Sequence, residues 1–172
     1  MAALLGSNTM TRGRVAVLLN ADPPDHRRQR KLVNPAFRPD RIRAMEPTIT
    51  EVALKLLEGV KADLHANGQT DILRTFTVGV PMTIIAFALG VAGEDLATFK
   101  RWSDDIVMPV GNHSPSVEQV RGFLISTKEF TEYFLGQIAV RKAQPTGDLL
   151  CDIANAKIDG EELTDDEQLG ML

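Results

Sequence analysis

The chain has 172 residues, 44% of them hydrophobic, which is enough to bury the core of one domain and short for two. Its net charge of -4 comes from 19 Lys and Arg residues against 23 Asp and Glu residues, which does not suggest a nucleic-acid-binding protein. The single cysteine, Cys151, excludes an internal disulfide framework, and the three dispersed histidines offer no metal-binding spacing. The longest apolar stretch, residues 78–93, is too short for a membrane span, and the first residues lack the features of a signal peptide. We therefore expect a cytoplasmic protein without a membrane partner.

Hydrophobic residues recur at helical spacing through most of the chain, which predicts a mainly α-helical fold without internal repeats. Asp22, followed by two prolines, predicts the start of a helix over residues 22–34, because Asp can cap the free amides of a first turn. After Pro47 the apolar residues recur every three or four positions and predict an amphipathic helix that ends at Gly68.

The middle of the chain is more apolar. Residues 71–89 predict a helix interrupted at Gly79 and Pro81, and its broad apolar surface indicates that other elements cover it on most sides. A further helix is predicted over residues 95–108. Residues 109–115 contain two prolines and a glycine, and they predict a loop that is a candidate lid.

The remaining elements are also predicted to be helical. A long helix is expected over residues 116–142 and a short one over residues 148–156, followed by a turn at residues 158–160. Thr164 and Glu167 form a capping box that opens another helix, with only eight residues after the cap. So short a helix is marginal by itself, and we expect the natural gene product to continue beyond it.

Several stretches resemble, in order and spacing, segments of the bacterial soluble cytochromes P-450, which are haem-thiolate monooxygenases. Residues 22–39, DPPDHRRQRKLVNPAFRP, closely resemble the C-helix signature of that family. Residues 84–91 resemble its E helix and residues 94–104 the start of its F helix. Residues 147–150 resemble the entry to its H helix, and residues 163–172 resemble the first turns of its I helix.

The resemblance implies that residues 1–172 are one partial cytochrome P-450 domain, truncated at both ends and without an internal domain boundary. Such an enzyme takes two electrons from NAD(P)H through a redox partner and uses haem b to insert one oxygen atom of O2 into an organic substrate. The family's oxygen-activating Thr and its cysteine-ligand loop are not found in this sequence. We therefore expect no catalytic residue and no iron ligand in the chain, which should be inactive alone.

Cys151 lies at a position similar to the family's H helix, between apolar neighbours. In that context it is expected to be a small buried hydrophobic residue and not the iron ligand, since a ligand cysteine needs a loop of polar donors around it.

His26 and Arg30 are candidate cofactor-binding residues. They are one helical turn apart and share a face, so both can reach one anion. The resemblance implies that this anion is a haem propionate, to which Arg supplies a fixed charge and His a further donor. The alternative is a solvated basic helix without a ligand.

Basic residues are concentrated near one end of the sequence. Residues 26–43 carry seven bases and one acid, whereas residues 144–172 carry eight acids and one base. The resemblance implies that Arg27, Arg28 and Lys31 face an electron donor of the ferredoxin or flavodoxin type, since a basic surface speeds the encounter with an acidic protein. The alternative is a helix that its charges keep in solvent.

The resemblance also implies a chamber for a lipophilic small-molecule substrate, to which apolar side chains near two of the helices contribute. The candidate residues are Val17, Leu18, Leu19, Ile106, Val107 and Val110. The alternative for each of them is a place in the ordinary core.

The sequence does not exclude a function of a different class. The chain could be a free-standing helical protein that binds a small ligand or regulates a partner without catalysis, which the absence of catalytic motifs favours. The C-helix signature and the short final helix argue for the enzyme.

Overall fold

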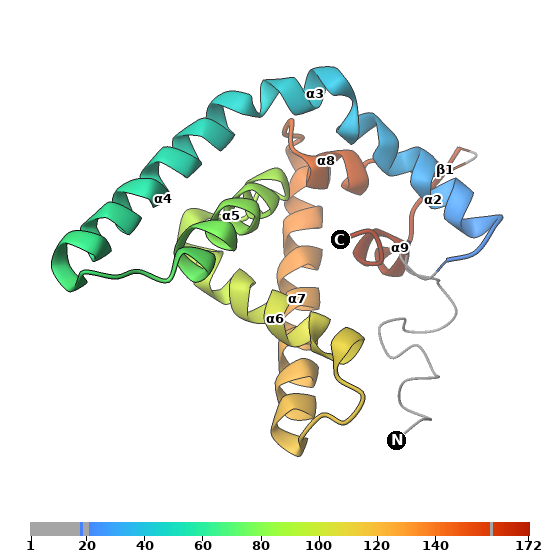
Figure 1. The fold of residues 1–172 in the computed structure, drawn as a ribbon. Coiled ribbons are helices and arrows are strands. Elements are labelled where there is room, and N and C mark those ends of the chain that lie inside the picture. Colours follow the sequence, from blue (N-terminus) through green and yellow to red (C-terminus); the bar gives the residue numbers. More distant parts are fainter. Residues whose placement is uncertain (1–17, 19–20, 159) are drawn as a thin grey trace. The chain divides into compact units, whose positions relative to one another are not determined.

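The computed structural model describes residue 18, residues 21–158 and residues 160–172, and it is mainly helical, as predicted (Figure 1). The described chain forms two compact units. Residues 101–172 and the described residues before Phe37 form the first unit, and Phe37–Lys100 form the second. The absence of an internal domain boundary stays a prediction. Within the described residues, no helix is long and apolar enough to cross a membrane.

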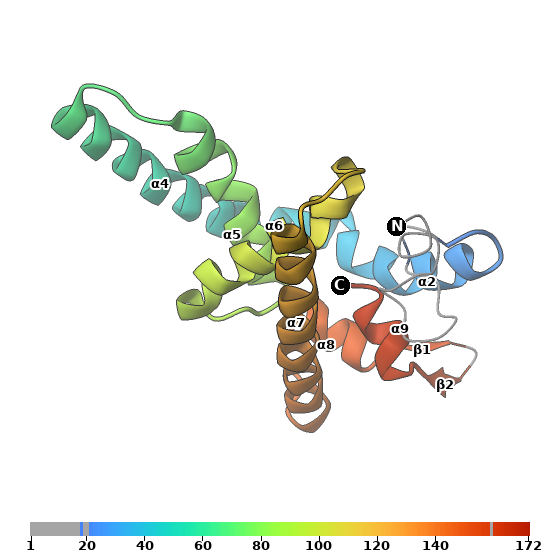
Figure 2. The same cartoon turned by 90° about the horizontal axis from the view of Figure 1, so that it is seen from below.

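The first unit is built on the long helix α7 (Val117–Ala143). Helices α8 (Leu149–Ala154) and α9 (Asp165–Leu169) pack against α7, as Figures 1 and 2 show. Helix α2 (Asp25–Val33) packs against α8 and against strand β1 (Lys157–Ile158). Phe134 and Ile138 from α7 and Leu150 and Ile153 from α8 are at most 3% exposed and form the core of this unit.

Helix α2 begins three residues later than predicted. Its N-cap is Pro24, and no side chain caps its first turn. The prediction that the Asp22 carboxylate caps this helix is therefore wrong, because Asp22 contributes its backbone carbonyl instead, which accepts a hydrogen bond of 3.0 Å from the amide of His26.

Helix α6 (Leu96–Gly111) runs further than predicted. The predicted loop over residues 109–115 is wrong at its start, because residues 109–111 are helical. Proline lacks the N–H that would donate to the carbonyl four residues earlier, but its φ fits a helix, and only two residues follow it before α6 ends. The connection to α7 is therefore short. A hydrogen bond of 3.0 Å, from the amide of Ser114 to Oδ1 of Asn112, stabilises its backbone.

Helices α7 and α9 each begin after a residue whose side-chain hydroxyl caps the first turn, at the positions where the sequence predicts these helices to start. Ser116 and Gln119 form a complete capping box at the start of α7, and Thr164 and Glu167 form one at the start of α9. The predicted turn after α8 lies within a hairpin that the sequence did not predict. In it, β1 pairs antiparallel with β2 (Glu161–Glu162).

The second unit packs three helical elements together. Helix α4 (Glu46–Asn67) contacts the π-helical turn η3 (Leu73–Thr77) and helix α5 (Gly79–Ala88), which also contact each other. The predicted interruption is confirmed at Gly79, where α5 starts, and is wrong at Pro81, which lies in the first turn of α5, where a proline is tolerated. A side chain at this position would approach Leu56 of α4 to 3.0 Å, so glycine allows the two helices to come close.

The remaining elements of the second unit are short. Helix α3 (Pro39–Ala44), which the sequence analysis did not predict, precedes and contacts α4, and the 3-10 turn η4 (Gly93–Asp95) precedes α6. Another 3-10 turn, η2 (Asn34–Phe37), follows α2 at the boundary of the units.

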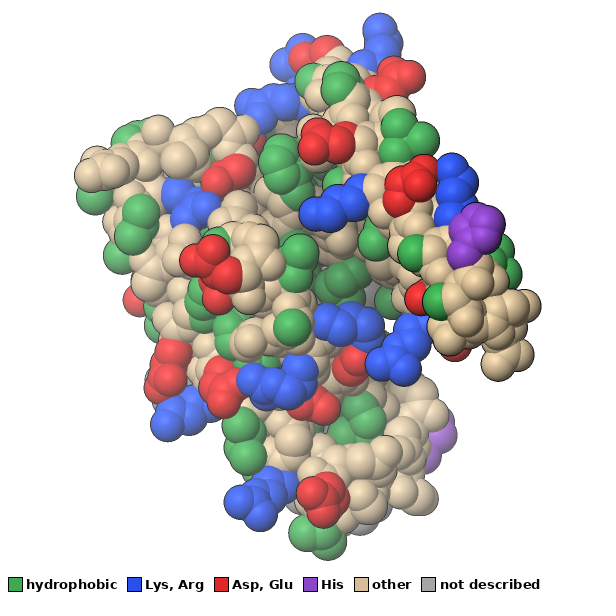
Figure 3. All heavy atoms as spheres, turned by 90° about the vertical axis from the view of Figure 1, so that its left-hand side faces the viewer, with side chains coloured by type: hydrophobic (Ala, Val, Ile, Leu, Met, Phe, Trp, Pro, Cys, Tyr) green, Lys and Arg blue, Asp and Glu red, His purple; other side chains and the backbone are tan. Residues whose placement is uncertain are grey.

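The surface of the second unit keeps many hydrophobic side chains exposed. The expectation that residues 71–89 are covered on most sides is not met, because Ile85 and Phe87 of α5 are more than half exposed. Leu54 of α4 and Leu73 of η3 are exposed as well. Hydrophobic side chains are visible among charged ones in the space-filling view of Figure 3.

Candidate functional site

The rotation of α2 about its axis is set by two buried side chains. Gln29 and Val33 are one helical turn apart, are 7% and 4% exposed, and mark the side that faces α8 and β1. The basic side chains of this helix are all exposed. Gln29 and Val33 form a buried stripe along α2. The basic residues fall into two groups, one beside this stripe and one on the opposite side of the helix.

His26 and Arg30 lie beside the buried stripe. At 100° per residue, His26 is about 20° and Arg30 about 60° from Val33 around the helix axis. Their spacing of four residues places the two side chains on one edge of α2. In the described part of the chain, no carboxylate forms an ion pair with either side chain, so both can donate to an added anion.

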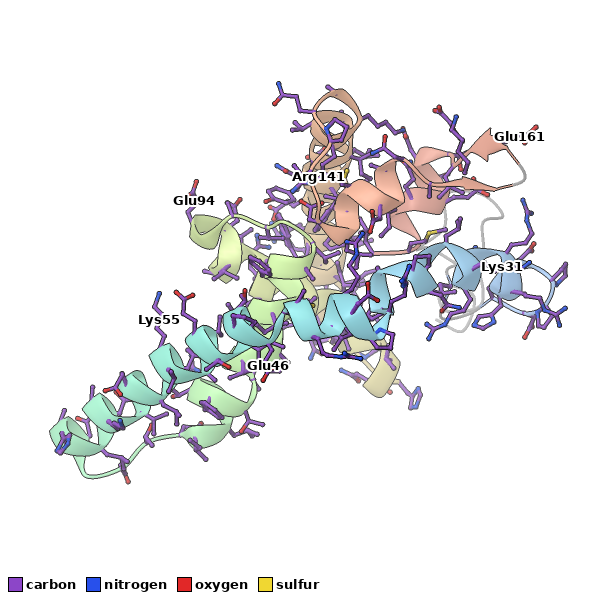
Figure 4. All side chains as sticks on the ribbon, turned by 90° about the horizontal axis from the view of Figure 1, so that it is seen from above. Lys31, Glu46, Lys55, Glu94, Arg141 and Glu161 are labelled. Atoms are coloured by element: carbon purple, nitrogen blue, oxygen red, sulfur yellow. The ribbon has the colours of Figure 1, made fainter. Side chains whose placement is uncertain are left out.

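Arg27, Arg28 and Lys31 point away from the stripe, at about 120° to 160° from Val33 by the same count. Arg28 lies 3.9 Å from Asp25, but both side chains are at least half exposed, and such a pair contributes little. Lys31, which Figure 4 labels on α2, is exposed. The outer side of α2 is thus a small basic surface distinct from the His26 edge.

Of the predicted substrate-chamber residues, the structure describes Leu18, Ile106, Val107 and Val110. Val17 and Leu19 lie outside the described residues, and Leu18 is partly buried, with its amide 3.4 Å from the carbonyl of Gly170. On α6, Ile106 is partly buried. Val107 and Val110 are 58% and 71% exposed, so they contribute to the surface of α6 in this structure. Their role in a chamber stays a prediction.

Cys151 is buried at 6% exposure in α8, as expected for a structural thiol. Its Sγ accepts hydrogen bonds from the amide of Thr146 at 3.2 Å and from Nδ2 of Asn155 at 3.5 Å. The thiol is thus held inside a helix by its own neighbours, which is the environment of an inert cysteine.

A buried ion pair joins the end of α7 to the start of α8. Nη2 of Arg141 donates to Oδ2 of Asp148 at 2.9 Å, and Nε donates to the same oxygen at 3.0 Å. Nη1 of Arg141 donates to Oε1 of Gln137 at 2.6 Å, and Asp148 caps α8 by accepting from the amide of Cys151 at 2.7 Å. Figure 4 labels Arg141 in this region.

The pKa of Asp148 reflects this environment. Burial of the carboxylate raises its pKa, but hydrogen bonds from Arg141 and from the amide of Cys151 lower it by more, so that the pKa lies below its ordinary value. Asp148 therefore stays ionised and paired at neutral pH.

A second polar cluster, which the sequence analysis missed, connects α6 to α7. Nη1 of Arg101 donates to the hydroxyl of the fully buried Ser126 at 2.9 Å, and that hydroxyl donates to Oδ2 of Asp105 at 2.5 Å. Nη2 of Arg101 and Nε1 of Trp102 both donate to Oε2 of Glu129, at 2.5 and 2.8 Å. These bonds lower the pKa of Glu129, with the bond from Trp102 as the largest cause.

Comparison with known proteins identifies the family. The family model for cytochrome P450 matches residues 5–138. The steroid C26-monooxygenase of Mycobacterium tuberculosis (strain CDC 1551 / Oshkosh) is 32% identical over 151 residues, which cover 88% of this chain and 39% of the relative. Cytochrome P450(MEG) of Priestia megaterium is 28% identical over 87% of this chain and 35% of its own length.

The similarity extends to solved structures. The structure of cytochrome P450 CYP109Q5 from Chondromyces apiculatus is 36% identical with a TM-score of 0.73, and the match covers 91% of this chain and 36% of that one. The chain thus spans 35% to 39% of the length of the relatives named above. The family match, the relatives and the shared fold together show that this chain belongs to the cytochrome P450 family.

Proposed function

We propose that this chain is part of a haem-dependent monooxygenase that hydroxylates a lipophilic small molecule, and that residues on α2 hold the cofactor at its edge. The observation that carries the proposal is the match of the cytochrome P450 family model to most of the chain. Haem b bound through a cysteine thiolate would supply the iron at which O2 is reduced and one of its oxygen atoms is transferred. The chain alone is expected to be inactive.

The residues of α2 fit the edge of such a cofactor. A haem propionate is a carboxylate, and His26 and Arg30 present nitrogen donors on the same edge of the helix, beside its buried stripe. A guanidinium binds a carboxylate through two parallel hydrogen bonds, and an imidazole adds a third donor. Each contact would contribute on the order of 1.5 to 3 kcal/mol.

The thiolate ligand would come from a segment outside these residues. The burial of Cys151 inside α8 supports this part of the proposal. A ligand thiolate needs an open face toward the metal and a loop of amide donors around the sulfur.

The outer side of α2 is proposed to receive the electron donor. Arg27, Arg28 and Lys31 are exposed and lie on the side opposite the buried stripe, so an acidic ferredoxin or flavodoxin could approach them without contacting His26 or Arg30. Long-range attraction between a basic surface and an acidic partner raises the association rate and weakens with added salt.

We propose that the substrate is a steroid or a related secosteroid, which the names of several relatives support. Besides the steroid C26-monooxygenase, they include the vitamin D(3) 25-hydroxylase of Pseudonocardia autotrophica, which is 31% identical over 90% of this chain. A structure of CYP109E1 from Bacillus megaterium in complex with testosterone is 32% identical with a TM-score of 0.74. Such substrates are large, rigid and mostly apolar, as a chamber with apolar walls requires.

The test uses the complete reading frame that contains this sequence. The purified product should give the carbon monoxide difference spectrum of a thiolate-ligated haem, and added testosterone should perturb its Soret band. Arg30→Ala should speed haem transfer to apomyoglobin by about tenfold or more, since the lost contact is on the order of 1.5 to 3 kcal/mol. Arg28→Ala, on the outer side of the same helix, is the matched control and should leave the rate unchanged.

Two results would contradict the proposal in different ways. A complete product without a thiolate-type spectrum would remove the monooxygenase function and favour a free-standing helical ligand-binding protein. A thiolate-type spectrum with equal haem loss in Arg30→Ala and Arg28→Ala would keep the enzyme but remove the α2 edge from the cofactor site.

A further inference from the structure

The only tryptophan and the only tyrosine of the chain are neighbours. Trp102 on α6 and Tyr133 on α7 have ring centroids 5.3 Å apart, with an angle of 56° between the ring planes. Trp102 is 4% exposed, and Phe130 and Phe134 complete the aromatic cluster, with Phe130 at 6.2 Å from Trp102 and Phe134 at 5.2 Å from Tyr133. Indole and phenol are the two aromatic side chains that lose an electron most readily, and here they are in contact.

A carboxylate is hydrogen-bonded to the indole nitrogen. Nε1 of Trp102 donates to Oε2 of Glu129 at 2.8 Å, within the range over which a base accepts a proton. Arg101 fixes this carboxylate by donating to the same oxygen, and Arg101 is itself held by the buried hydroxyl of Ser126. The base is therefore positioned before any reaction, as efficient proton transfer requires.

The carboxylate also connects the indole with solvent. The side chain of Glu129 is 41% exposed, although the ring of Trp102 beside it is buried. A proton that reaches Glu129 can therefore leave to water. Removing an electron from indole makes its N–H strongly acidic, so that a positioned base decides how fast the cation radical becomes neutral.

We propose that Trp102, Glu129 and Tyr133 form a site for proton-coupled one-electron oxidation. A one-electron oxidant takes an electron from Trp102, and the indole N–H proton passes to Glu129, which leaves a neutral tryptophanyl radical. Tyr133 then reduces this radical, the proton on Glu129 returns to the indole nitrogen, and the phenol proton goes to water. The net change is one electron and one proton lost from Tyr133, with Trp102 restored. The site requires no haem, since any one-electron oxidant of sufficient potential can start the sequence.

Pulse radiolysis of the 172-residue chain tests this site, with the azidyl radical as the oxidant because it attacks tryptophan in preference to tyrosine. The tryptophanyl absorption should decay with a first-order rate that is independent of protein concentration, while an equal amount of tyrosyl radical appears. Tyr133→Phe keeps the ring and should abolish the second absorption and prolong the first.

Glu129→Gln tests the proton acceptor. It should slow deprotonation of the tryptophan cation radical on the order of 100-fold, the lower end of the effect of removing a positioned base. Glu132→Gln, an exposed carboxylate on the same helix, is the matched control and should leave this rate unchanged. Tryptophanyl decay that scales with protein concentration would overturn the site. Equal deprotonation rates in Glu129→Gln and Glu132→Gln would also overturn it as proposed.

Discussion

The ion pair between Arg141 and Asp148 offers a quantitative test of what holds α8 to α7. In Asp148→Ala, the guanidinium, whose side chain is 7% exposed, loses its bonds to both carboxylate oxygens, and α8 loses the cap on the amide of Cys151. Removing one partner of a buried pair costs about 3 to 5 kcal/mol, because the remaining charge stays buried without compensation.

The lower end of this range applies here. The Asp148 side chain is 19% exposed, and Gln137 still accepts a hydrogen bond from Arg141 in the variant. We therefore expect a loss of about 3 kcal/mol from the pair and about 1 kcal/mol from the cap. With an m value of about 2 kcal/mol/M, the urea midpoint should fall by about 2 M.

Urea unfolding followed by far-ultraviolet circular dichroism measures this change. Asp165→Ala, which removes an exposed acid from the first turn of α9, is the control and should cost less than about 1 kcal/mol. A midpoint for Asp148→Ala that falls no further than that of Asp165→Ala would refute the reasoning. It would show that the guanidinium finds water or another acceptor at no cost.

Three further predictions follow from the same structure. The folded-state pKa values of Asp148 and Glu129 are lowered, so their contributions to stability are present above the unfolded carboxyl pKa values of about 4 and are lost as pH falls through the lower folded values. Acid unfolding monitored by the fluorescence of Trp102 should show this loss, and a signal that changes only above pH 5 would contradict it. Gly59→Ala should raise the unfolding free energy by about 0.5 to 1 kcal/mol, because nothing lies within 4 Å of a new Cβ there. Gly68→Ala at the end of the same helix should lower it by about 1 kcal/mol or more, because φ is +69°. The 172-residue chain mixed with haem, reduced and exposed to carbon monoxide should show no thiolate-type Soret band, and such a band would make Cys151 a ligand.

Features that depend on a few neighbouring residues were predictable from the sequence. The end of α4 at Gly68 and the capping box of Thr164 and Glu167 are confirmed, because each involves groups within one turn of the chain. The extension of α6 through Pro109 was not predictable in this way. The fixed φ of proline fits both a loop and a helix, so the same residue is compatible with a loop and with a helix that ends two residues later.

The cluster between α6 and α7 depends on information that the sequence does not carry locally. Arg101, Ser126 and Glu129 are ordinary polar residues in their own helices, and their contact requires a particular rotation of each helix about its axis. Gly122 contributes to that packing, since a Cβ there would lie 3.4 Å from Oδ1 of Asp105. A spacing of one turn within a helix indicates that residues share a face. It does not identify which face of the neighbouring helix packs against them.

For α2, too, the sequence predicted which side chains share a face, but not which face is buried. The spacing of His26 and Arg30 was enough to place them on one side, but the helix is so polar that its pattern does not show which side is buried. The burial of Gln29, a polar residue, together with Val33 sets that side. Arg28 therefore lies on the outer side of α2, whereas Arg30 lies beside the buried stripe. Arg28→Ala and Arg30→Ala each remove one positive charge from the same helix, but from different sides of it. A difference in haem retention between these two variants would therefore report where the charge lies and not how much charge the helix carries.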